Sequence, residues 1–143
     1  MNDQTSFETL WAGGFNGVLR WPQLDALWET VRTTGAWYVY QVGEELPAEP
    51  LEGEALARVL AELDALLKKE HEHDYCGIVY ADSLETPQLV KVYDPNHLGA
   101  SCGSSGLKIL PRWIISRPAP SHIEETAPVP ANRRRWWQRL LPG

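Results

Sequence analysis

The chain has 143 residues, of which 43% are hydrophobic and 22% charged, so its length and composition fit one globular domain and exclude a wholly disordered chain. Residues 1–116 hold 8 Lys/Arg and 17 Asp/Glu, a net charge of −9, whereas residues 117–143 hold 5 Arg and 2 Glu, a net charge of +3. The acidic body argues against nucleic acid as the main ligand, because phosphate contacts need clustered cations.

Two segments have the pattern of amphipathic helices. Apolar residues recur at helical spacing from Trp21 to Thr34, where Pro22 suits a first helical turn. A second and cleaner stripe runs from Leu56 to Leu67, with charged residues at the intervening positions. We expect one helix at each place.

Four short segments have the composition of strands. Residues 36–42 (AWYVYQV) are dense in aromatic and β-branched residues. Residues 75–81 and 88–93 are apolar runs separated by a short polar stretch, which predicts an antiparallel hairpin. Residues 112–116 (RWIIS) make the last strand. The sequence thus predicts an α+β fold in which two helices cover one face of a small, mostly antiparallel sheet of about four strands.

Residues 94–111 form a long Gly/Ser-rich loop, and long loops inside compact domains are functional or disordered. Cys102 and His97 make this loop a candidate thiol site, because an imidazole near a loop thiol lowers its pKa; the alternative is a buried structural cysteine. The loop contains no credible hydrolase motif. It also lacks the Gly-Lys-Ser/Thr sequence that ends a P-loop. Its backbone amides could still form a nest that binds an anion. The other polar loop candidates are Asp94, Asn96, Ser101, Ser104 and Ser105.

His71, His73 and Cys76 supply nitrogen and sulfur ligands of the kind that bind zinc or iron. Their spacing matches no common metal motif, so a solvated helix end is the competing interpretation, and we expect no bound cofactor.

Three features of the sequence bear on where the protein is located. Two cysteines do not form a disulfide framework, the first residues do not resemble a leader, and no run of 18 apolar residues occurs. These features predict a cytoplasmic protein.

Residues 133–143 are basic and aromatic, in contrast to the acidic body. Two Trp and two Leu share one helical face, and they are costly to leave in water. We expect this tail to dock on a protein partner, with anionic lipid, its own body or no surface at all as alternatives. Its candidate binding residues are Arg133, Arg134, Arg135, Trp136, Trp137, Arg139, Leu140 and Leu141.

The expected organisation is a single domain over residues 1–120, a flexible Pro/Ala/Glu linker over 121–132 and the docking segment over 133–143. Two functions remain open. The first is an accessory or adaptor protein that binds a protein partner through the tail, and it does not need an enzymatic site. The second is a small thiol- or metal-dependent protein that uses Cys102 and His97.

Overall fold

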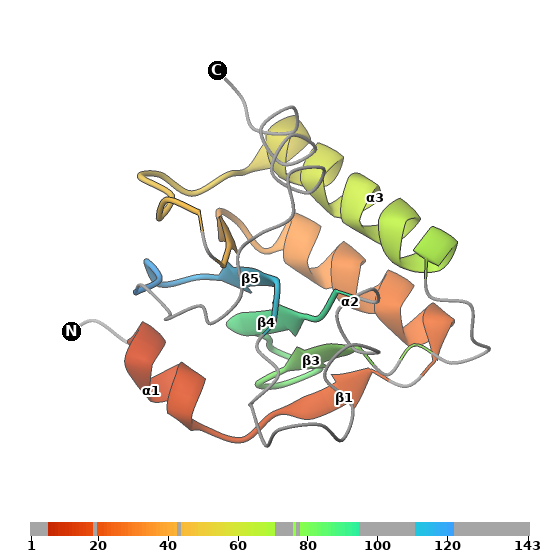
Figure 1. Ribbon diagram of the computed structural model, residues 1–143, viewed down its shortest axis with the longest axis horizontal. Coiled ribbons are helices and arrows are strands. Elements are labelled where there is room, and N and C mark those ends of the chain that lie inside the picture. Colours follow the sequence, from red (N-terminus) through yellow and green to blue (C-terminus); the bar gives the residue numbers. More distant parts are fainter. Residues whose placement is uncertain are drawn as a thin grey trace.

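The computed structural model describes residues 6–18, 20–42, 44–70, 76, 78–94 and 111–121. Within these ranges the chain forms three helices and five strands, which confirms the α+β class (Figure 1). In chain order they are α1 (Phe7–Ala12), β1 (Asn16–Val18), α2 (Trp21–Thr33), β2 (Tyr38–Gln41), α3 (Gly53–Glu70), β3 (Val79–Ala81), β4 (Leu89–Val92) and β5 (Trp113–Ser116).

The strands form one antiparallel sheet in the order β1-β3-β4-β5-β2. The expected hairpin is confirmed, since Val79 of β3 pairs with Val92 of β4. The last strand, β5, lies between β4 and β2, so Val90 and Val39 both pair with Ile115. The sheet has five strands because β1, which the sequence did not predict, adds an edge beside β3.

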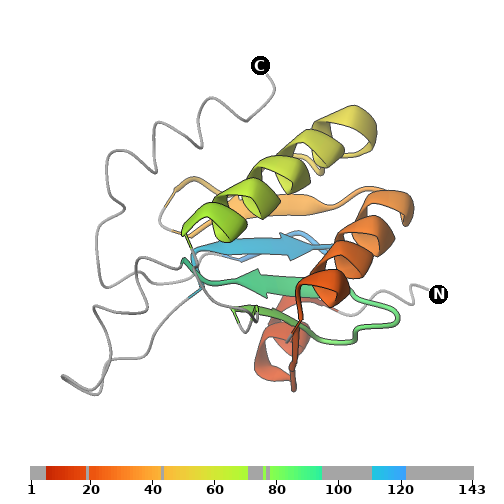
Figure 2. The same cartoon turned by 90° about the vertical axis from the view of Figure 1, so that its right-hand side faces the viewer.

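One face of the sheet carries the main hydrophobic core, which α2 and α3 cover side by side (Figure 2). Both predicted helices are confirmed, and α3 begins three residues before its apolar stripe. Trp37 and Trp113 are fully buried in this core, and burial of such large rings is a major stabilising contribution. The helical residues of the core are Leu24, Leu27, Trp28 and Val31 of α2 and Leu56, Val59, Leu60, Leu63, Leu66 and Leu67 of α3.

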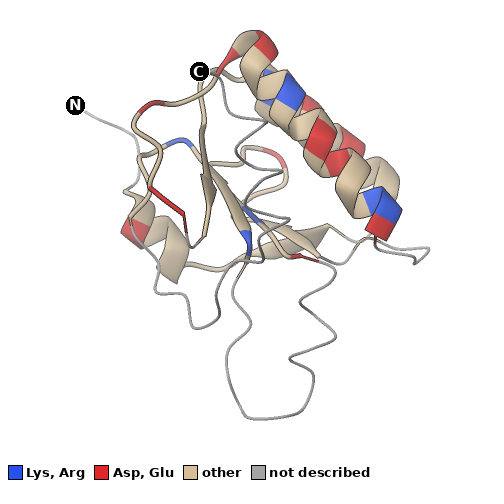
Figure 3. Ribbon diagram, turned by 45° about the horizontal axis from the view of Figure 1, so that its top comes forward, with Lys and Arg blue, Asp and Glu red and all other residues tan. Residues whose placement is uncertain are grey.

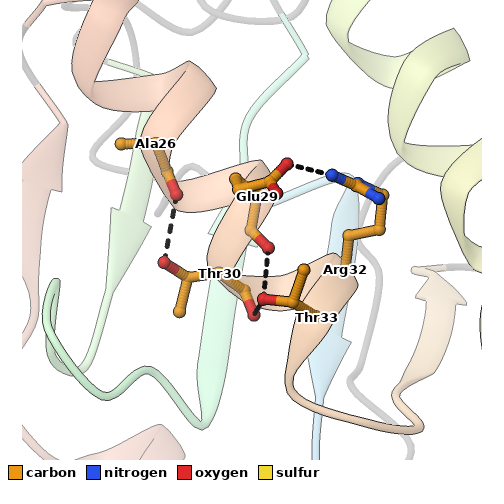
Figure 4. A network of polar contacts seen from close by, with 5 residues as sticks. All are labelled: Ala26, Glu29, Thr30, Arg32 and Thr33. Atoms are coloured by element: carbon orange, nitrogen blue, oxygen red, sulfur yellow. Dashed lines mark hydrogen bonds and ion pairs between the residues drawn. The ribbon is translucent and has the colours of Figure 1, made fainter.

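The solvent-facing side of α2 is held by short-range polar contacts (Figure 4). The hydroxyl of Thr30 donates to the carbonyl oxygen of Ala26 at 3.1 Å, and that of Thr33 donates to Glu29 O at 2.8 Å. The side chain of Arg32 pairs with the Glu29 carboxylate. These contacts satisfy polar groups near the end of the helix, but exposed pairs of this kind contribute little to stability.

The exposed rim between α2 and α3 is charged (Figure 3). Lys68 Nζ lies 3.1 Å from Asp25 of α2 and 3.1 Å from Asp64 of α3. Asp64 also accepts a hydrogen bond from the indole nitrogen of Trp28 at 3.1 Å. Burial lowers the pKa of Lys68, but its hydrogen bonds to the two carboxylates outweigh this effect, so the net pKa is raised.

The two expected helices cover one face of the sheet, and α1, which the sequence did not predict, packs on the other face. Side chains alternate across a strand, so Tyr40, Leu89 and Ile114 point away from the main core. Phe7 and Leu10 of α1 are buried against them and form a second, smaller core. Ser6 precedes this six-residue helix and caps it, because its side chain accepts a hydrogen bond from Thr9 N.

Candidate functional site

Of the loop residues proposed as a thiol site, the structure describes only Asp94. It follows β4 and is 5% exposed. Arg112, which begins the return of the chain into β5, is 4% exposed and donates through Nη1 to Val42 O at 3.2 Å. The two ends of the loop are therefore anchored in the interior of the protein. The remaining candidates lie outside the described residues: Cys102, His97, Asn96, Ser101, Ser104 and Ser105.

Cys76 lies in the main hydrophobic core and is fully buried. Burial, which disfavours the thiolate, raises the pKa of this thiol. The thiol form is thus favoured at neutral pH, and it packs as a small apolar group. His71 and His73 lie outside the described residues, so the metal site remains a prediction; the described part of the chain holds no cluster of three His, Cys, Asp or Glu arranged for a metal ion.

A buried polar pair joins β2 to β5 inside the main core. The indole nitrogen of Trp113 donates to Gln41 Oε1 at 2.9 Å, and both side chains are fully buried. The other amide atom of Gln41, Nε2, has no hydrogen-bond partner among the described residues. Trp113 follows Arg112 in the chain, and Gln41, Asp94 and Arg112 are three of the four buried polar residues that the structure describes.

The most distinctive surface of the described body lies on the second face of the sheet, around Lys91 of β4. Its ammonium is 4.2 Å from the ring centroid of Trp11, at the end of α1, and 3.7 Å from that of Phe15. Tyr80 pairs with Lys91 across the strands, and its ring meets that of Tyr93 edge-on at 5.7 Å. We call these five half-buried residues the aromatic surface, of which Tyr93, just after β4, also packs against the main core.

The electrostatics of the aromatic surface follow from partial burial. Burial lowers the pKa of the Lys91 ammonium, because an apolar environment disfavours its charged form. Burial, and secondarily the neighbouring Tyr80, raises the pKa of Tyr93. The faces of the two rings over Lys91 attract its cation and offset part of the desolvation cost. This surface can thus present aromatic edges and one cation to a partner.

Gly17 of β1 allows Tyr80 to lie flat across the edge of this surface. A Cβ atom at position 17 would meet Tyr80 Cε2 at 3.1 Å, which is closer than ordinary van der Waals contact. Position 17 pairs directly with position 80. The missing side chain therefore determines where the Tyr80 ring lies.

The predicted docking segment, residues 133–143, lies outside the described residues, but the chain leading to it is described up to Ser121. Arg117 donates to Thr34 O at the end of α2, and its guanidinium lies 5.5 Å from the ring centroid of Trp37. Ser121 donates to the carboxylate of Glu8 on α1. The described chain therefore ends beside α1.

Two features of this region have local signals in the sequence. Ser6 followed by Phe7, Leu10 and Trp11 has the capping residue and spacing of a short helix. In residues 88–93, successive side chains of the strand point to opposite faces of the sheet, so Lys91 lies on the same face as Leu89. The contact with Phe15, in contrast, has no local signal because it depends on how the turn after α1 folds back.

Comparison with known protein families, curated proteins and solved structures finds no match. Among the helices that the structure describes, none combines the length and hydropathy that crossing a membrane requires.

Proposed function

We propose that this protein is an accessory or adaptor protein that binds a protein partner, with the basic-aromatic tail as its docking segment. The observation that carries the proposal is where the described chain ends before the tail: Ser121 is bonded to Glu8 of α1, whose last turn supplies Trp11 to the aromatic surface. A partner can thus contact the tail and the body at neighbouring positions.

The aromatic surface and the tail have similar chemistry, since each combines aromatic side chains with positive charge. The aromatic surface offers half-buried rings, which are common anchors in protein interfaces, around a cation. The tail offers Trp136 and Trp137 with four arginines in eleven residues. Because one chain carries both, binding of the first raises the effective concentration of the second. This arrangement suits a protein with a hydrophobic groove rimmed by acidic residues.

The experiment is an affinity purification from the native host with the full chain and with a chain that stops at Thr126. We expect a partner that the full chain retains and the shortened chain loses. The interaction is then measured with purified proteins. Changing Trp136 and Trp137 to Ala should weaken binding on the order of 30-fold, as expected for two aromatic anchors.

Two further variants test the arrangement. Gln138→Ala is the matched control within the tail, and it should bind as the unaltered chain does. Phe15→Ala should weaken binding by a smaller factor if the aromatic surface is the second contact. A partner that the shortened chain retains equally well would contradict the role of the tail, and the absence of any specific partner would contradict the adaptor function.

A further inference from the structure

The helix α1 is held on the second face of the sheet by three side chains with helical spacing. Phe7 and Leu10, at positions i and i+3, are buried against the sheet. Trp11, at i+4, stacks on Phe7 and lies over Lys91. We call the sheet surface beneath them the α1 seat; its buried residues are Tyr40, Val42, Leu89 and Ile114.

The same spacing occurs once more at the other end of the chain. In residues 137–141 (WQRLL), an aromatic residue, two polar residues, a leucine and a second large apolar residue follow one another as they do in residues 7–11 (FETLW). In α1 the two intervening polar residues, Glu8 and Thr9, are exposed. The equivalent Gln138 and Arg139 would face solvent in the same way, which keeps the arginine away from Lys91.

The connection between the two segments allows the tail to reach the α1 seat. Ser121 donates to Glu8 on the exposed side of α1, so the described chain ends beside the helix that covers the seat. Fifteen residues, 122–136, separate Ser121 from Trp137. A chain of this length spans up to about 50 Å when extended, and the entropic cost of closing such a loop grows only slowly with length.

We propose that the α1 seat is a docking site with two occupants, in which residues 137–141 of the same chain replace residues 7–11 when α1 leaves the sheet. The tail would then cover the apolar sheet face that α1 exposes. While it is docked, its tryptophan anchor is withheld from any other protein. This inference concerns the isolated chain and does not rest on the proposed function.

The sequence differences explain why α1 is the preferred occupant. Ser6 caps α1, whereas the equivalent position before Trp137 is Trp136, which has no capping oxygen. Trp11 places its ring over Lys91, whereas the equivalent residue is Leu141. The tail therefore keeps the two main apolar anchors and lacks the cap and the cation–π contact.

The test is a double-mutant cycle in the full chain, in which thermal unfolding gives the melting temperature of each variant. Leu140→Glu alone should leave the melting temperature unchanged within about 1 °C, because α1 occupies the seat. Leu10→Glu drives α1 off, and in that background Leu140→Glu should lower the melting temperature by a further shift of about 4 °C. Gln138→Glu, equivalent to the exposed Glu8, is the control and should have no effect in either background.

Equal effects of Leu140→Glu in both backgrounds would overturn the inference. A coupling that disappears on tenfold dilution would assign the seat to the tail of a second copy and would overturn the intramolecular assignment. If Leu10→Glu does not fold, Phe7→Ala replaces it in the same cycle. Leu141→Trp, which restores a ring for Lys91, should enlarge the coupling, and a decrease would contradict the proposed equivalence with Trp11.

Discussion

The two faces of the sheet are stabilised in different ways. On one face, α2 and α3 cover a continuous core with two fully buried tryptophans. On the other, the six residues of α1 bury Phe7 and Leu10 in a much smaller core. An isolated helix of this length is unstable in water, so α1 depends on its contacts with the sheet. The first face therefore contains most of the buried apolar residues, and we expect the second to open first.

Two lysines show the same difference in electrostatic terms. Lys68, at the rim of the helix-covered face, lies between two carboxylates that raise its pKa. Lys91, on the second face, lies between two aromatic rings, and burial lowers its pKa. Among the described residues Lys91 has no carboxylate partner, so only the two ring faces offset the desolvation of its ammonium.

The largest effect is expected in the main core, from Trp113→Ala. The substitution removes a fully buried ring and leaves Gln41 Oε1 without its indole donor. We expect the free energy of unfolding to fall by about 4 kcal/mol. Urea unfolding followed by circular dichroism measures it, with the exposed Leu84→Ala as the control. A loss below about 1 kcal/mol would contradict the structural role assigned to this face.

The second prediction concerns local opening of α1. Leu10→Ala should cost about 2 kcal/mol, at the low end for a buried leucine because the small core can relax. Hydrogen exchange should show that the amides of α1 lose protection while those of α3 keep theirs. Equal loss of protection in both helices would show that the two faces unfold as one unit, and it would contradict the proposed difference in their stability.

A smaller effect is expected from the contact between α2 and α3 at Asp64. Asp64→Ala removes the acceptor for the Trp28 indole and one partner of Lys68, and it should cost about 1 kcal/mol. Asp64→Asn keeps an acceptor oxygen for Trp28 and should recover most of this loss. If both substitutions cost the same, the charge and not the hydrogen bond to Trp28 would hold the rim.

The smallest effects are the opposite pH dependences of the two lysines near their ordinary pKa of 10.5. The pKa of Lys91 is lowered on folding, so the native state releases its proton first, and its contribution to stability rises with pH. The pKa of Lys68 is raised on folding, so its contribution is complete below 10.5 and is lost as pH rises further.

Arginine variants isolate these two contributions, because arginine stays charged throughout. From about pH 9 upward, the unaltered chain should gain stability relative to Lys91→Arg and lose stability relative to Lys68→Arg. Urea unfolding at a series of alkaline pH values measures both differences. The same sign for both lysines would contradict the contrast between the two faces.

The residue pattern was sufficient to predict α2, α3 and the pairing of β3 with β4, because each depends on local periodicity or on a short connection. It was not sufficient for β1, which is three residues long and becomes a strand only by pairing with β3. The predicted thiol, metal and tail sites stay predictions, since most of their residues lie outside the described ranges.

The sequence by itself determined the elements whose stability is local: two amphipathic helices, an antiparallel hairpin and a basic tail on an acidic body. Only the tertiary structure decided that α1 packs on the second face and that Phe15 and Trp11 flank Lys91. It also decided that the described chain ends beside α1, at Ser121. These contacts join residues far apart in the chain, and their energies come from burial that exists only once the sheet has formed.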